Sequence, residues 1–334
     1  MIKSLSSKKL TPIILSTFLC VVILGLFSAC DPMINEDQGD NTPTDEEHDY
    51  RTFYTNKKID YGKISDSYHS DLVMYFAGNQ FMVIEDLIQD FQTKNPDINK
   101  IYIETIPPGQ ILKTQLLKQG MINGENTTMN PDLFATVNVN HLKKLHEKGL
   151  MSQYIIYTHN KLELMIAKGN PKNIKGVKDL GRDDIVQSHP NPVTEGVFKY
   201  TSAMLKDLGL FEKVTGNAYC KGCWAVPEKT WFTERHHRET PYRIENGQAD
   251  TGLVWTTEVA YAKIQNRPID GVIINPPYNQ QSKVDYVIGA MLKAKNSANA
   301  HRFIKYMASK AAQDIYISYG FIPATASQLQ IKSL

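Results

Sequence analysis

The residues in this sequence best suited to chemistry lie between Thr233 and Thr257, in front of a predicted helix. The segment reads TERHHRETPYRIENGQADTGLVWTT. Thr240 has a hydroxyl that can cap a helix, Pro241 suits the first helical position, and Gly247 suits the left-handed residue that closes the helix. A helix start presents free N–H groups and partial positive charge, so the arginines just upstream favour an anion site.

Three kinds of chemistry fit the ionisable residues of this segment. Arg235 and Arg238 would give an anion charge-assisted, bidentate donors. His236, His237 and Glu239 would suit a transition metal, and the same residues would supply the acid and base of an enzyme. Because we identify neither a nucleophile with a partner base nor a cofactor motif, we expect a binding protein without a cofactor rather than an enzyme. The anion is the leading interpretation and the metal is the alternative.

The N-terminus has the pattern of an export signal. Three lysines precede an apolar run over residues 12–27, and two small residues then lead to Cys30. This order is typical of a secretory signal, and the run is short for a membrane span. The cysteine makes the segment similar to the lipobox of bacterial lipoproteins, although Phe27 replaces the usual smaller aliphatic residue. The resemblance implies that residues 1–29 are removed and that Cys30 is lipidated. An uncleaved anchor is the alternative, and both place the body outside the cytoplasm.

The segment after Cys30 is acidic. Between Asp31 and Tyr50 it holds eight Asp or Glu residues, no Lys or Arg, and few apolar residues. Such a segment cannot bury enough surface to fold, so we expect a flexible tether over residues 30–68. Without the three signal lysines and these eight acids, the 37 basic and 35 acidic residues of the chain leave the body near +7. This mild excess fits a small anionic ligand, and the scattered basic residues predict no nucleic-acid binding.

Two cysteines remain in the body, in the motif C-K-G-C. In an oxidising compartment a disulfide between Cys220 and Cys223 is the favoured interpretation, although so short a loop adds little entropic stability. A zinc site shared with His236 or His237 is the alternative. Redox catalysis ranks third, because no thioredoxin-like strand precedes the pair.

The elements that must position these residues alternate between strands and helices. Apolar runs predict strands at Leu72–Ala77, Ile101–Thr105, Asp132–Val137, Leu162–Ala167, Thr251–Trp255, Val272–Asn275 and Val284–Leu292. Apolar residues at helical spacing predict helices at 81–91, 111–117, 142–150, 197–208, 298–310 and 312–319. The alternation predicts an α/β fold in which helices flank a parallel sheet. Ligands of such sheets sit beyond the carboxyl ends of the strands, where Asn79 and Gly109 would lie.

Four short segments carry a resemblance to a known family. They are YFAGN at 75–79, PDLFA at 131–135, ENGQADTGLVW at 245–255 and YGFIP at 319–323. In this order, behind a lipoprotein-like signal, they resemble the extracellular solute-binding proteins of bacterial ABC importers. The branch that they resemble most binds molybdate or tungstate.

The resemblance implies a two-lobed α/β fold of the type II periplasmic-binding-protein kind. Its two hinge crossings would lie near residues 157–162 and 278–286. We place the first lobe at 69–158 and 284–334, and the second at 159–283. The ligand would sit in the cleft and close the lobes by a hinge motion.

The family holds its oxyanion with small hydroxyl residues and backbone N–H groups. Carried over to this sequence and joined with the central segment, the expected ligand-binding residues are Asn79, Gly109, Thr194, Glu195, His236, His237, Arg238, Glu239, Thr240 and Trp255. Two departures matter, because an oxyanion offers acceptors only. Pro107 and Pro108 supply no N–H, and the carboxylates of Glu195 and Glu239 would repel an anion unless they are turned away.

The resemblance also implies partners. These are a small anionic ligand, the permease of an ABC importer, and the membrane through the N-terminal lipid. We expect a monomer.

Overall fold

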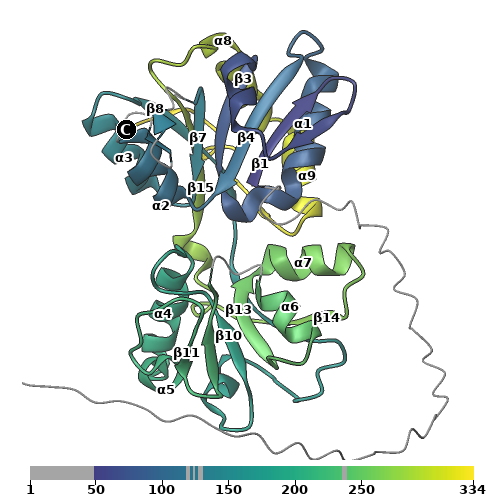
Figure 1. The fold of residues 1–334 in the computed structure, drawn as a ribbon, viewed down its shortest axis with the longest axis vertical. Helices are drawn as coiled ribbons and strands as arrows, with labels where there is room; N and C mark the ends of the chain where they lie inside the picture. Colours follow the sequence, from purple (N-terminus) through teal and green to yellow (C-terminus); the bar gives the residue numbers. More distant parts are fainter. Residues whose placement is uncertain (1–48, 118–120, 123–124, 127–130, 235–238) are drawn as a thin grey trace, which may run out of the picture. The chain divides into compact units, whose positions relative to one another are not determined.

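The computed structural model describes residues 49–117, 121–122, 125–126, 131–234 and 239–334. Pro43–Leu334 form one compact unit. Helices pack against two main sheets, and the chain passes from one sheet to the other twice (Figure 1). The α/β fold with two lobes and two crossings, predicted from the sequence, is confirmed.

The larger sheet has nine strands within the described residues, in the order β16-β8-β15-β7-β3-β4-β1-β2, with β17 paired to β8. Its strands are β1 (Tyr50–Tyr54), β2 (Ile59–Tyr61), β3 (Leu72–Ala77), β4 (Lys100–Ile106), β7 (Leu133–Thr136), β8 (Gln153–His159), β15 (Asp285–Ala290), β16 (Ile322–Pro323) and β17 (Lys332–Ser333). Strand β3 pairs in parallel with both β4 and β7. The remaining pairs are antiparallel, so the predicted parallel sheet is the centre of a mixed one.

The second sheet has six strands within the described residues, in the order β11-β12-β10-β13-β9-β14. Its strands are β9 (Leu162–Ala167), β10 (Gln187–His189), β11 (Cys223–Val226), β12 (Thr230–Phe232), β13 (Thr251–Trp255) and β14 (Ile269–Ile273). A small hairpin joins β5 (Met121–Ile122) to β6 (Glu125–Asn126).

Most helices follow a strand along the chain, whereas α5 and α9 each follow another helix. They are α1 (Phe81–Lys94), α2 (Pro108–Gln110), α3 (Val139–Glu147), α4 (Phe198–Asp207), α5 (Phe211–Thr215), α6 (Glu239–Glu245), α7 (Thr256–Ile264), α8 (Ser297–Met307) and α9 (Lys310–Ser318). Shorter turns are η2 (Ile64–His69), η3 (Gly78–Gln80), the π-helical η4 (Ile111–Leu116), η5 (Val177–Gly181) and η6 (Gln281–Lys283). Among the described residues, no helix has both the length and the apolar character needed to cross a membrane.

Both faces of the larger sheet are covered, because successive side chains of a strand point to opposite faces. From β3, Met74 and Phe76 join a core with α1 and α8, in which Phe303 meets Phe76 edge-on at 6.2 Å. Tyr75, between them, joins a separate core with α3 and η4 on the other face. A strand buried on both faces explains why its sequence is a continuous apolar run.

The two crossings follow β8 and β14. The first is short, because β9 begins three residues after His159. The second runs from residue 274 to 284 and contains the cis peptide bond between Pro276 and Pro277.

The flexible tether predicted over residues 30–68 extends too far toward the C-terminus, because its second half is folded. Residues 50–54 and 59–61 form β1 and β2, and β1 pairs along its whole length with β4. Phe53 is buried in the core, with 1% of its surface exposed. The acidic composition ends at Tyr50, and the following strand YRTFY has aromatic and β-branched residues that suit a sheet.

Candidate ligand-binding cleft

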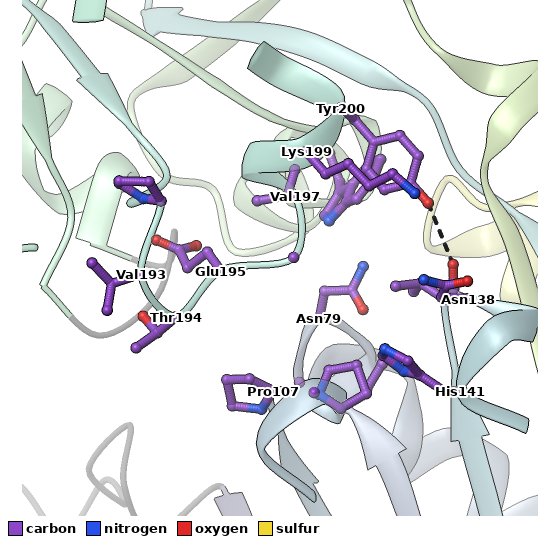
Figure 2. Close-up of a pocket in the computed structure, with 18 of the residues that line it drawn as sticks. Asn79, Pro107, Asn138, His141, Val193, Thr194, Glu195, Val197, Lys199 and Tyr200 are labelled. Carbon is purple, nitrogen blue, oxygen red and sulfur yellow. Dashed lines mark hydrogen bonds between the residues drawn. The ribbon is translucent and has the colours of Figure 1, made fainter. Parts of the chain in front are cut away.

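A cavity of about 270 Å³ lies where loops of the two sheets meet (Figure 2). One side is formed by residues that follow β3, β4 and β7, and the other by the start of α4 and the end of β13. The lining residues are Ala77, Gly78, Asn79, Thr105, Pro107, Pro108, Gly109, Val137, Asn138, His141, Pro192, Val193, Thr194, Glu195, Gly196, Val197, Lys199, Tyr200 and Trp255. This is the carboxyl-end position that the strand order predicts.

Five of the residues expected in the ligand site line this cleft: Asn79, Gly109, Thr194, Glu195 and Trp255. Asn79 lies in η3, and its Nδ2 donates to the hydroxyl of Tyr286. Trp255 is 2% exposed and packs edge-on against Tyr200, with ring centroids 5.5 Å apart. Tyr200 in turn donates its hydroxyl hydrogen to the carbonyl oxygen of Val137 at 3.4 Å, which joins the two sides of the cleft (Figure 2).

The carboxylate of Glu195 is engaged by its own loop and by Thr233, which follows β12. Its Oε1 accepts from the backbone N–H of Asn191 at 3.0 Å, from Asn191 Nδ2 at 3.2 Å and from the hydroxyl of Thr233. Thr194 is committed in the same way, because its N–H and its hydroxyl both donate to Asn191 Oδ1, at 2.8 and 3.0 Å. These two residues therefore build the loop that borders the cleft.

His141 and Lys199 bring ring nitrogen and positive charge to the cleft. Burial, with Lys144, Lys113 and Lys199 nearby, lowers the pKa of His141 to about 4, so the imidazole is neutral at physiological pH. Its Nδ1 lies 2.8 Å from Thr136 Oγ1. Lys199, in the first turn of α4, is exposed and has no carboxylate partner among the described residues.

Sequence reasoning missed both residues. His141 lies in a predicted strand-to-helix connection and Lys199 in a predicted helix, and nothing in their types distinguished them from other surface residues. The available signal was their position in the chain. His141 lies in the first turn of the helix that follows β7, and Lys199 lies in the first turn of the helix that follows the cleft loop of the second sheet.

Glu239 and Thr240 lie away from the cleft lining. Glu239 Oε1 accepts from the indole N–H of Trp231 at 2.9 Å, and Oε2 accepts from the backbone N–H of Glu234 at 2.7 Å. Thr240 is fully buried, with its hydroxyl 2.9 Å from that of Ser188.

The predicted helix cap at Thr240 was wrong. Helix α6 begins at Glu239, so Thr240 is already helical and its hydroxyl is used in a tertiary contact. Pro241 follows in the first turn, where a missing N–H still costs nothing. Gly247 has a φ of +65°, as expected of the residue that closes this helix.

The remaining predicted site residues divide into two groups. Arg235, His236, His237 and Arg238 lie outside the described residues, as does Cys30. Cys220 and Cys223 are joined by a disulfide at the start of β11. Across the part of the chain that the structure describes, no three His, Cys, Asp or Glu side chains are grouped as metal ligands.

Comparisons with known proteins agree on the type of fold. The family model described as bacterial extracellular solute-binding protein matches residues 72–322. The substrate-binding domain of a putative molybdenum ABC transporter from Clostridium difficile is 18% identical, with a TM-score of 0.57, over 76% of this chain and 99% of that one. The periplasmic molybdate-binding protein of Azotobacter vinelandii is 19% identical, with a TM-score of 0.60, over 76% and 100%.

A similar structure with a different ligand is the iron-bound HitA of Pseudomonas aeruginosa. It is 17% identical, with a TM-score of 0.54, over 77% of this chain and 91% of that one. At these identities the likeness is one of fold. No curated protein matches the sequence.

Proposed function

We propose, for a chain that belongs to the bacterial extracellular solute-binding proteins, that its cleft captures a small oxyanion of the molybdate or tungstate kind. The family binds solutes and does not catalyse reactions, and it places the body of the chain outside the cytoplasm. Capture would then serve delivery to the permease of an ABC importer. Affinity and closure of the cleft would be the whole mechanism.

A lysine without a carboxylate partner in the part of the chain that the structure describes carries this proposal. Lys199 lines the cleft with no carboxylate partner among the described residues. Glu195, the acidic residue of the lining, spends Oε1 on three hydrogen bonds within its own part of the fold. Lys199 is therefore the lining cation that can attract an anion, while Oε1 of Glu195 is already engaged in hydrogen bonds within the protein.

Helix starts at the cleft add donors. Helix α3 has Asn138 as its N-cap and α4 has Val197, and both residues line the cleft. Asn138 Oδ1 accepts from the backbone N–H of Asn140 at 3.0 Å, which leaves its NH2 group as a donor. An oxyanion requires such donors, and the partial positive charge of a helix start favours it further.

The proposed attachment to the membrane comes from the N-terminal sequence. Lipidated Cys30 would anchor the chain, and the acidic segment that ends near Tyr50 would let the body stand off the membrane. Detection of the lipid on Cys30 by mass spectrometry, and its loss in Cys30→Ser, would test this part separately.

Thermal unfolding against a ligand panel tests the oxyanion. The mature chain with Cys30→Ser would be heated with molybdate, tungstate or sulfate, and separately with zinc or iron and a chelator control. A ligand at a hundred times its Kd adds about 2.7 kcal/mol to stability. We expect molybdate or tungstate to raise the midpoint in the wild type and much less in Lys199→Gln.

Lys206→Gln is the matched control for Lys199. It removes a lysine from the same helix, α4, at a position outside the cleft lining. It should keep the full anion shift. A shift produced only by metals and abolished by chelator, or an equal anion shift in Lys199→Gln, would overturn the proposal.

A small organic anion is the second candidate. Much of the lining is apolar, with Val137, Val193, Val197 and two prolines after β4. Carboxylates and phosphate esters therefore belong in the same panel. Glu239 is a poor candidate for the alternative metal site, because both oxygens of its carboxylate already accept hydrogen bonds.

A further inference from the structure

Two buried amide side chains from separate parts of the chain meet at the hydroxyl of Tyr286, and one of them also bonds Thr257. Asn79 Nδ2, at the cleft, donates to this oxygen, and Asn160 Nδ2 does so at 3.2 Å. Asn160 Nδ2 also donates to Thr257 Oγ1 at 3.0 Å. Asn79 is 6% exposed and the other three are fully buried. In the protein interior an unpaired polar group is costly, so each of these contacts matters.

The direction of the contact from Asn160 is determined by its neighbour. The backbone N–H of Lys161 donates to Asn160 Oδ1 at 2.9 Å. The other end of the amide must therefore be the NH2 group that reaches Tyr286. The phenol oxygen accepts from Asn160, and its own hydrogen needs an acceptor. Among the described side chains, Asn79 is the remaining one bonded to this hydroxyl.

The amide of Asn79 has no backbone anchor of this kind, and within the described residues its one hydrogen bond is to Tyr286. We infer that Tyr286 is the positioning residue that lets Asn79 serve as a hydrogen-bond donor in the cleft. With Nδ2 on Tyr286, Oδ1 is left for the cleft. After a half turn, Oδ1 accepts the Tyr286 hydrogen and both hydrogens of Nδ2 are left for the ligand.

An anion selects the second orientation, because it offers acceptors only. In the second orientation Asn79 Oδ1 also accepts the buried Tyr286 hydrogen, for which the first orientation offers no acceptor among the described side chains. This inference rests on the proposed function, since it concerns an anion in the same cleft. Figure 2 shows Asn79 between Lys199 and Tyr200 on one side and His141 on the other.

The same contacts join the ligand donor to both crossings between the sheets. Asn160 lies in the first crossing, between β8 and β9, and Tyr286 lies in β15, directly after the second. Thr257 belongs to the first turn of α7, beside the second sheet. A ligand that turns Asn79 therefore changes the hydrogen bonding of the segments about which the sheets would move.

A double-mutant cycle with molybdate as the probe tests the inference on the mature chain carrying Cys30→Ser, with Kd measured by calorimetry. Tyr286→Phe removes the hydroxyl and should raise Kd about tenfold. Asn79→Asp keeps the size and an acceptor for Tyr286 but lacks N–H donors, so it should raise Kd about a hundredfold or more.

The double variant distinguishes positioning from independent effects. Because Tyr286 acts through Asn79, the variant with both changes should bind no more weakly than Asn79→Asp alone. An unchanged Kd in Tyr286→Phe, or effects that multiply in the double variant, would show the inference to be wrong.

Tyr306→Phe is the matched control for a purely structural effect. Its hydroxyl also makes buried hydrogen bonds, to Asp90 Oδ2 at 2.7 Å and to the carbonyl oxygen of Leu87 at 3.1 Å, away from the cleft. Both tyrosine variants should lower the thermal midpoint, but only Tyr286→Phe should weaken binding. Equal weakening by Tyr306→Phe would overturn the inference.

Nuclear magnetic resonance of the ligand-free protein separates this inference from the proposed function. Failure of molybdate to bind the wild type would refute the proposed oxyanion alone. The side-chain amide signals of Asn79, identified by their absence in Asn79→Asp, should move in Tyr286→Phe and stay in place in Tyr306→Phe. If they stay in place in Tyr286→Phe, the positioning role is refuted whatever the ligand is.

Discussion

His159 and Asp285 form an ion pair between the end of β8 and the start of β15, with Nδ1 of the histidine 2.9 Å from Oδ1 of the aspartate. Nδ1 also lies 3.1 Å from the carbonyl oxygen of Val284, and Nε2 lies 3.1 Å from Gln328 Oε1. Gln328 Oε1 is an acceptor, since the backbone N–H of Thr325 donates to it at 2.9 Å. Both ring nitrogens thus face acceptors, which requires the imidazolium.

This pair predicts a stability that declines with rising pH. The hydrogen bond from His159 to Asp285 raises the pKa of His159 above its ordinary 6.5, and burial opposes the rise. The contribution is therefore complete below the ordinary pKa and is lost as pH rises through the raised value. We expect wild type to have a higher thermal midpoint than His159→Gln below pH 6.5, and the gap to shrink as pH rises above that value. A gap that widens with pH would contradict the prediction.

Glu104 predicts a second pH dependence. It is fully buried in β4, beside Tyr75 of β3 in the sheet register, and Oε1 accepts from Gln115 Nε2 at 2.6 Å. Burial raises the pKa of this carboxyl from 4.5 to about 8. The folded protein holds a proton between those values that the unfolded chain releases, so stability should fall as pH rises from 4.5 to about 8.

Glu104→Gln removes this titration and keeps an acceptor for Gln115. We expect the variant to match wild type near pH 4.5, where both side chains are neutral, and to exceed it progressively up to about pH 8. Urea unfolding midpoints at several pH values measure the difference. Profiles that stay parallel across this window would show that Glu104 is not protonated in the folded state.

Replacing Glu195 should lower the stability of the fold but raise the affinity of the cleft for an anion. Glu195→Ala leaves the buried N–H of Asn191 with a weakened set of acceptors, and we expect a loss of about 2 kcal/mol in urea unfolding. Glu195→Gln keeps the oxygen, so its loss should be smaller. Because it also removes a negative charge from the cleft lining, it should bind molybdate more tightly than wild type. Weaker binding by Glu195→Gln would contradict this account of the cleft.

Gly252 in β13 should tolerate no side chain. A Cβ atom there would lie 2.5 Å from the carbonyl oxygen of Ser188 and would collide with the side chain of Thr240. We expect Gly252→Ala to lower the free energy of unfolding by about 3 kcal/mol, because β10 and α6 must both move away from β13. Gly176→Ala, where nothing lies within 4 Å of the added atom, is the control and should change stability little. Equal effects of the two substitutions on denaturant midpoints would refute the close-packing argument.

The sequence by itself determined the central strands, the larger helices and the family. Leu72–Ala77 is apolar throughout because it is covered on both faces, and this signal needs no knowledge of distant residues. The carboxyl ends of such strands then indicate where Asn79, Gly109 and Trp255 must lie. Composition predicts an export signal and an acidic segment, although β1 and β2 begin where that segment was expected to continue.

Only the tertiary structure decided what those residues contact. Asn79 and Tyr286 are 207 positions apart, and no local pattern links them. Thr240 has the right type for a cap, yet its hydroxyl pairs with Ser188 because β10 brings that residue against α6. Lys199 and His141 have ordinary residue types on their own helices. They line one cavity because the chain crosses twice between two sheets and brings their loops together.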